Sequence, residues 1–304
     1  MRVILLGPQR RPTVDAVMHW LGLAGPVATI TAGWQEREPD DAELGALVPG
    51  EAVNLGLYRR WLDVQDRDPE YAAGERRLQG VLAELQNLYL LRLDLALQAV
   101  YGLLRREANP ASVTAADEAI AAVQDLDEAH LKRVNGVRRE FFERMRPHDR
   151  PVIAEHRAFV EAALAEATAL LVAGGHVGVL TDVLHLFNVA PALRPGAPVI
   201  AWSAGAMALA DRIVLFHDRA PQGAGHPEIY GSGLSVLRDV VLLPHARGRL
   251  LLDDTARMAV FARRFAPARC VLLEQGTRLD TDGTWLAGGR VLGEDGRVGV
   301  AEAA

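Results

Sequence analysis

Cysteine and aromatic residues are scarce in this chain of 304 residues, and its 33 basic residues are outnumbered by 39 acidic ones. It has one cysteine, Cys270, only 6% aromatic residues and a net charge of −6. A lone cysteine forms no intrachain disulfide and supplies no multi-cysteine zinc site, so we expect a reducing, cytoplasmic environment. A chain of negative net charge lacks the broad basic surface that nucleic acids require, so nucleic acid is not an expected partner.

Long apolar runs and cofactor motifs are also missing. No apolar run reaches the ~18 residues that a membrane span needs, and the N-terminal run at 1–7 is too short for a secretion signal. The chain has no Walker A loop and no G-x-G-x-x-G motif, and its nine histidines show no H-E-x-x-H spacing. We therefore predict no membrane contact, no cofactor and no metal.

Apolar residues make up half of the chain, and their spacing changes along it. Strand-type runs at 2–7 and 27–32 flank a helical pattern at 13–23, which predicts a β-α-β opening, with a third strand expected at 52–57. Near the C-terminus, glycine and aspartate turns separate short apolar runs around Trp285, Val291 and Val298, which predicts antiparallel hairpins.

Residues 60–150 hold hardly any strand-type segment and follow a helical period instead. We predict a helical insertion there, between two parts of one α/β core at 1–59 and 151–304. The leucines of its first half surround more than one face: Leu82, Leu85, Leu88, Leu91, Leu95 and Leu97. Such a helix needs cover on several sides, so the insertion is expected to cap the active site, to form a homodimer or to pack on the core.

The segment Val199 to Gly205 runs from a β-branched strand into a turn of small residues with Ser203 at its apex. A serine on such a strand-to-helix turn is a nucleophile elbow, with its hydroxyl exposed at the carboxyl end of the sheet. Ala201 stands where this pattern usually has glycine. A tight strand-to-helix connection without a catalytic role is the alternative interpretation.

Another apolar strand pattern ends in the paired glycines Gly174 and Gly175, and a helical pattern follows from Val177. Parallel strands end at the same edge of a sheet, so the backbone N–H groups of Gly175 and Ala204 could together hold an oxyanion. A simple tight turn is again the alternative.

Two further strand patterns end in residues that complete a triad. One leads into His245, where a general base is needed, and the other leads into Glu274, a carboxylate that could orient the imidazole. Asp218 follows Ser203 by 15 residues and is the second candidate for the orienting carboxylate. The predicted catalytic set is Ser203, His245 and Glu274.

Four segments together resemble the serine peptidases of the aspartyl dipeptidase and cyanophycinase type, which share the class I glutamine amidotransferase-like fold. These segments are 172–175 ahead of a helix, 202–206 around the serine, Pro244-His245 with the arginines that follow, and 273–276. The resemblance is good over 151–290 and weak over 1–58. It implies a three-layer α/β sandwich with a mostly parallel sheet, interrupted by the helical insertion.

The same resemblance implies roles for individual residues. Ser203 would be the nucleophile, His245 the base and Glu274 its orienting carboxylate, while Gly175 and Ala204 would supply the oxyanion hole. Residues near the site would be Gly174, His176, Trp202, Asp218, Arg247 and Arg249. The sequence departs from the family pattern at Ala201, which replaces glycine, at His176, which replaces asparagine, and at Ala246, which replaces an aromatic residue.

The predicted function is therefore a serine hydrolase, a peptidase that cleaves short or aspartyl-type peptides through an acyl-enzyme. The preference for an acidic residue on the acyl side comes from the resemblance and would need a cation such as Arg247 or Arg249. Two alternatives stay open: a non-catalytic binding or assembly protein that keeps the fold, and an esterase for small acyl substrates.

Overall fold

The computed structural model describes residues 1–219, 225–281 and 288–301, whose strands form three sheets. The largest sheet is mixed and mostly parallel, with the order β10-β1-β5-β4-β2-β3. Its strands are β1 (Val3–Leu6), β2 (Val27–Ile30), β3 (Ala52–Asn54), β4 (Ala169–Val172), β5 (Val199–Trp202) and β10 (Arg278–Thr281). Only the pairing of β1 with β10 is antiparallel within this sheet.

Helices cover both faces of this sheet, which explains why every residue of β1, β2, β4 and β5 is buried. On one face, Val17 and Met18 of α1 (Val14–Trp20) join an apolar cluster with Ile4 of β1. On the other, Ile153 of α6 (Pro151–Glu166) and Leu180 of α7 (Val177–Leu186) join a cluster with strand residues. The central architecture is thus an α/β sandwich.

A second sheet of order β12-β11-β9-β8 holds β8 (Val240–Pro244), β9 (Arg269–Leu273), β11 (Arg290–Leu292) and β12 (Val298–Val300). The third sheet pairs β6 (Ile213–Leu215) with β7 (Glu228–Gly231). The predicted C-terminal hairpin is confirmed by the antiparallel pair β11 and β12, whereas Trp285 lies outside the described residues. The sequence pattern did not predict that β8 and β9 leave the main sheet.

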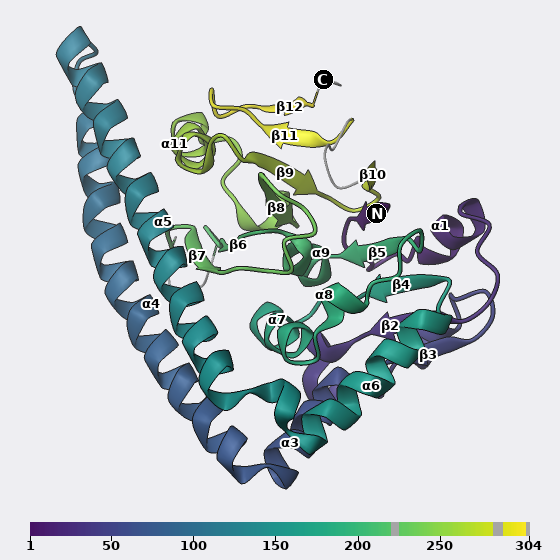
Figure 1. Ribbon diagram of the computed structural model, residues 1–304. Coiled ribbons are helices and arrows are strands. Elements are labelled where there is room, and N and C mark those ends of the chain that lie inside the picture. Colours follow the sequence, from purple (N-terminus) through teal and green to yellow (C-terminus); the bar gives the residue numbers. More distant parts are fainter. Residues whose placement is uncertain (220–224, 282–287, 302–304) are drawn as a thin grey trace.

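Most of the predicted insertion is a hairpin of two 36-residue helices, α4 (Pro69–Leu104) and α5 (Pro110–Met145), which follow α3 (Leu57–Arg67). Each long helix spans about 54 Å at 1.5 Å per residue. Asn109 begins α5 with a capping box, in which its side chain accepts hydrogen bonds from the N–H groups of Ala111 and Ser112. Figure 1 shows the hairpin along one side of the molecule, with its tip projecting past the body.

The hairpin is attached to the body by apolar and ionic contacts. Its upper half shares an apolar cluster with the second sheet and with α11 (Thr255–Phe265). Within that contact the buried Arg264 of α11 forms an ion pair of 2.7 Å with Asp127 of α5, and Tyr89 of α4 donates a hydrogen bond to the same carboxylate. The helical character predicted for this segment is confirmed, while the division into domains stays a prediction. No helix in the described ranges is long and apolar enough to cross a membrane.

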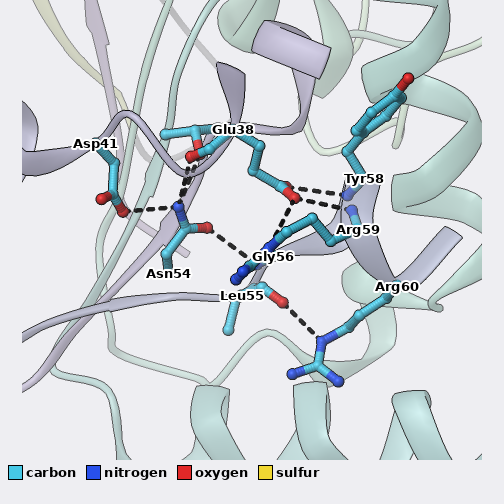
Figure 2. A network of polar contacts seen from close by, with 9 residues as sticks. Glu38, Asp41, Asn54, Leu55, Gly56, Tyr58, Arg59 and Arg60 are labelled. Atoms are coloured by element: carbon cyan, nitrogen blue, oxygen red, sulfur yellow. Dashed lines mark hydrogen bonds and ion pairs between the residues drawn. The ribbon is translucent and has the colours of Figure 1, made fainter. Parts of the chain in front are cut away.

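A buried carboxylate fixes the start of α3, from which the hairpin departs (Figure 2). The side chain of Glu38 is fully buried, and its two oxygens accept hydrogen bonds from the N–H groups of Tyr58 and Arg59. Its carbonyl oxygen accepts a hydrogen bond from the Asn54 amide, at the end of β3. Burial raises the pKa of Glu38, and the two backbone hydrogen bonds oppose that rise. The network joins η1 (Ala32–Arg37), β3 and α3.

The short helices complete the chain between these elements. They are α2 (Ala42–Gly45), η2 (Pro147–Asp149), α8 (Val189–Ala192), α9 (Ala204–Leu209) and α10 (Ala246–Arg249). Two of them begin directly at predicted catalytic residues, since Ser203 precedes α9 and His245 precedes α10. The carboxyl ends of β5 and β8 therefore position the candidate site.

Candidate active site at two strand ends

Ser203 occupies a strained turn between β5 and α9, with φ 52° and ψ −125°. A positive φ is unfavourable for a residue with a Cβ and persists where the surrounding structure enforces it. Gly205 explains the close packing, because a Cβ there would lie 2.2 Å from the carbonyl oxygen of Val172. Helix α9 thus packs directly on the end of β4. Ala201 is a fully buried strand residue paired with Val172, so alanine is compatible with this turn.

The two glycines after β4 lie against this turn. A Cβ on Gly174 would lie 2.8 Å from the Cβ of Ser203, and a Cβ on Gly175, whose φ is +123°, would lie 2.2 Å from the carbonyl oxygen of Gly33. Both positions therefore require glycine for steric reasons. The backbone N–H groups of Gly175 and Ala204 donate to no other described residue, which leaves both as hydrogen-bond donors beside Ser203.

His176 and Trp202 flank these turns in structural positions. The Nδ1 atom of His176 accepts a hydrogen bond of 3.1 Å from the N–H of Val179 and caps α7. The backbone N–H of His176 donates to the carbonyl oxygen of Gly33. Trp202 is buried in the apolar cluster of the α1 face. Neither side chain lines the cavity of about 600 Å³ whose wall includes Ser203 and Ala204.

His245 and Glu274 leave two paired strands side by side. Pro244 of β8 is in parallel register with Leu273 of β9, and the N–H of His245 donates to the Leu273 carbonyl at 3.1 Å. The end of β1 reaches the same place, since a Cβ on Gly7 would lie 1.7 Å from the backbone oxygen of Glu274. This close approach brings the carboxyl ends of the two sheets together.

The Glu274 carboxylate contacts α10 in this structure. Its Oε1 accepts a hydrogen bond of 2.8 Å from the N–H of Arg247, and no hydrogen bond joins it to His245 within the described residues. Burial lowers the pKa of His245, and the charges of Arg249 and Arg10 lower it further, whereas the Glu274 charge raises it. Glu274 therefore acts on the imidazole through its charge. Ser203 and His245 likewise form no hydrogen bond with each other.

Asp218, the second candidate for the orienting carboxylate, has other partners. Its side chain is fully buried and accepts two hydrogen bonds from the Arg257 guanidinium, at 2.6 and 3.1 Å, and one from the N–H of Leu251. These contacts occupy both carboxylate oxygens. Asp218 therefore ties the segment after β6 to α11, and no hydrogen bond joins its carboxylate to His245 in the described part of the chain.

Two cavities meet at Ser203. One, of about 600 Å³, lies between the turns and is lined by Gly175, Val177, Ser203, Ala204, Met207, Leu215, Phe216, His217, Gly225, His226, Glu228, Pro244, His245 and Arg249. The other, of about 660 Å³, is also lined by Ser203, Gly175 and His245, and adds Arg10, Trp34 and Trp202. The serine and the histidine thus stand at the boundary between two spaces.

The two candidate arginines face different spaces. Arg249 lines the first Ser203 cavity with its guanidinium carbon 5.9 Å from the centre of the Phe216 ring, and burial lowers its pKa. It has no carboxylate partner among the described residues. The Arg247 side chain is exposed and lines a separate cavity beside β11 and β12.

Several residues that line the cavities were not predicted from the sequence. His226 lies in the wall of the first cavity, where an oxygen of Asp94 of α4 lies 3.4 Å from its Nε2. The helical hairpin contacts the cavity indirectly in this way and contributes no lining residue from its described helices. Arg10 and Trp34 follow β1 and β2, and only the strand order could have placed them there. The described residues contain no group of three or more His, Cys, Asp or Glu that could hold a metal ion.

No protein family model matches the chain, and no curated protein matches it. Among solved structures, a peptidase from an acI-B1 Actinobacterium is similar to this chain, with 12% sequence identity and a TM-score of 0.43. That likeness covers 96% of this chain and 87% of the other, and it is too distant to carry an inference.

Proposed function

We propose that the protein is a serine hydrolase that cleaves short peptides, with Ser203 as nucleophile and His245 as general base. The observation that carries the proposal is the backbone of Ser203, held at φ 52° on a strand-to-helix turn that opens into a cavity shared with His245. A strained serine at such a turn, beside a histidine, has the arrangement that acyl transfer requires.

The chemistry follows from the groups around the turn. The imidazole takes the proton of Ser203, the hydroxyl oxygen attacks the substrate carbonyl, and the N–H groups of Gly175 and Ala204 donate to the resulting oxyanion. The bond to the leaving amine breaks as the imidazole returns the proton to that amine. Water, deprotonated by the same imidazole, then attacks the acyl-enzyme and releases the acid. In this proposal Glu274 stabilises the charged imidazole.

Arg249 supports an acidic substrate. It is a half-buried cation in the wall of the Ser203 cavity, without a carboxylate partner among the described residues. A buried charge without a partner is costly, and a substrate carboxylate would remove that cost. An acidic side chain on the acyl side of the cleaved bond would meet this guanidinium, while the leaving group would enter the second cavity.

A substrate screen tests the proposal. Purified protein is incubated with aspartyl dipeptides, with matched neutral dipeptides and with simple esters, and products are quantified for the parent and for Ser203→Ala. We expect cleavage of the aspartyl peptides by the parent and a loss of several orders of magnitude in the variant. Equal turnover by the Ser203→Ala variant would refute the assigned nucleophile, and cleavage of esters alone would favour the esterase.

The absence of hydrogen bonds from His245 to Ser203 and Glu274 is the observation that favours the non-catalytic alternative. Catalytic hydrogen bonds are often long before substrate binds, so this geometry does not exclude catalysis. A parent protein that cleaves none of the substrates would support the alternative, in which the chain keeps the fold as a binding or assembly protein.

A further inference from the structure

A third cavity, of about 570 Å³, lies apart from Ser203, where β11 and β12 meet the start of α11. Four arginines of the described residues line it, and they come from three separate regions of the chain. These are Arg219 after β6, Arg247 in α10, Arg290 in β11 and Arg297 just before β12. The fold therefore gathers four guanidinium groups around one space.

These four arginines lack the partners that other arginines of the protein have. Arg247 and Arg297 donate hydrogen bonds to carboxylates only through their backbone N–H groups, and none of the four guanidinium groups is paired within the described residues. Nearby, Arg257 and Arg264 of α11 each form an ion pair with an aspartate. Among the described residues, Asp253 is the single acidic residue in the cavity wall.

Positive charge is concentrated at this cavity, whereas the chain as a whole is negatively charged. The chain carries a net charge of −6, yet four cations and one carboxylate line this cavity in the part of the chain that the structure describes. All four arginines are exposed, so solvent screens their mutual repulsion in part, and a bound anion would reduce it further. The planar guanidinium, with five N–H donors, suits phosphate and carboxylate oxygens.

In the wall of this cavity, the turn between β11 and β12 packs tightly against the start of α11. A Cβ on Gly296 would lie 1.9 Å from the carbonyl oxygen of Thr255, and the φ of Gly296 is +78°. Glycine thus allows the turn between β11 and β12 to rest on the first residue of α11. That contact places Arg297 beside Thr255, which also lines the cavity.

We propose that this cavity binds a small molecule with two or more anionic groups, of the phosphate or carboxylate kind. Its volume exceeds that of a single inorganic phosphate, whose share of space is comparable to a few water molecules of about 30 Å³ each. The site does not depend on the hydrolase activity. It has no lining residue in common with the first Ser203 cavity, although α10 and the segment after β6 each contribute to both: Arg247 and Arg219 line the arginine-rich cavity, whereas Arg249 and His217 line the Ser203 cavity.

Thermal unfolding and calorimetric titration test this site, with pyrophosphate and citrate as probes. Sodium chloride and sodium acetate at matched ionic strength are the controls for screening. We expect one of the two probes to bind and to raise the unfolding temperature of the parent beyond the salt controls. A preference for pyrophosphate would indicate a phosphate ligand, and a preference for citrate a polycarboxylate.

The Arg290→Gln/Arg297→Gln variant should bind that probe at least about tenfold more weakly, because it loses two charge-assisted contacts. The matched control is Arg76→Gln/Arg77→Gln, which removes two exposed arginines of α4 and should bind like the parent. If the double variant does not fold, each single variant is titrated instead. The proposal is overturned if neither probe exceeds the salt controls, or if the Arg290 and Arg297 variants bind as the parent does.

Discussion

Ser203 and His245 share an uncommon backbone feature. Both have a Cβ and both have a positive φ, 52° and 57°, immediately after strands β5 and β8. Such residues cost stability and tend to persist where function selects them. Both also line the two cavities that meet at the strand ends. The backbone strain of these two residues and their position in the cavity walls thus identify the same serine and histidine that the sequence pattern predicted.

Replacing each candidate carboxylate separates its catalytic role from a structural one. Glu274→Gln removes the charge that raises the pKa of His245 and should lower kcat by at least about tenfold. Asp218→Asn leaves the Arg257 guanidinium without its buried partner and should lower the free energy of unfolding by about 3 kcal/mol. Steady-state kinetics and urea unfolding of both variants measure this. A larger kcat loss in folded Asp218→Asn than in Glu274→Gln would reverse the assignment.

The pH dependence of activity should follow the charges around His245. The base must be neutral, and its pKa is lowered by burial, by Arg249 and by Arg10, so the acid limb of kcat/KM should lie below the usual value of about 6.5. Arg249→Met removes a cation and should move that limb to higher pH. Glu274→Gln removes an anion and should move it to lower pH.

Profiles of kcat/KM against pH for the parent and both variants measure these shifts. If the acid limb moves in the same direction in Arg249→Met and Glu274→Gln, or moves in neither variant, His245 is not the titrating base. Arg76→Gln in α4 is a suitable control, since this exposed cation is not among the charges that shift the pKa of His245.

At the scale of elements, the short-range pattern predicted the strands better than their partners. The apolar runs that lead into Ser203, His245 and Glu274 were predicted as strands, and they are the strands β5, β8 and β9. The apolar spacing within a run does not encode which neighbour it pairs with, so the placement of β8 and β9 in a second sheet was not predictable. For the same reason Arg10 and Trp34 were not predicted near Ser203.

The ion pair between Arg264 and Asp127 should be important for holding the hairpin to the body. Asp127→Ala leaves a buried guanidinium unpaired and should lower the free energy of unfolding by about 3–5 kcal/mol. The neighbouring pair of Arg263 and Asp117 also joins α11 to α5 but is partly exposed, so Asp117→Ala should cost at most about 1 kcal/mol. Urea unfolding compares the two variants. Equal losses would mean that burial does not set the strength of this attachment.

The outer face of α4 suggests how the predicted homodimer would form. Val81, Leu88, Leu91 and Leu95 are 48%, 50%, 63% and 60% exposed, and their spacing is that of a coiled-coil seam. Glu84 and Arg92 each lie four residues from Leu88, on opposite sides of it, and neither is paired within the described residues. Two antiparallel α4 helices crossing at Leu88 would bring each Glu84 to the partner's Arg92.

Light scattering of purified protein tests this dimer. We expect a dimer for the parent, a monomer for Leu88→Glu/Leu95→Glu and weaker association for Glu84→Arg, where like charges would face each other. The swapped variant Glu84→Arg/Arg92→Glu should restore association. A monomeric parent, or a swapped variant no stronger than Glu84→Arg, would contradict this arrangement.

At the scale of the whole molecule, the chain joins two sheets at their carboxyl ends and attaches a long hairpin to one side (Figure 1). The sequence predicted the α/β core, the helical segment and the serine turn because each depends on local spacing. It did not predict where the hairpin lies, since the residues that fix it, such as Arg264 and Asp127, are 137 positions apart. The two cavities at Ser203 likewise form only when distant segments meet.

The most direct test of the central proposal is covalent labelling of Ser203. Purified protein is treated with a fluorophosphonate probe and digested, and the adduct is located by mass spectrometry in the parent, Ser203→Ala and His245→Ala. We predict one adduct, on Ser203, which is absent from Ser203→Ala and forms much more slowly in His245→Ala, because the imidazole activates the hydroxyl. An unlabelled parent, or a Ser203→Ala variant labelled as fast as the parent, would contradict it.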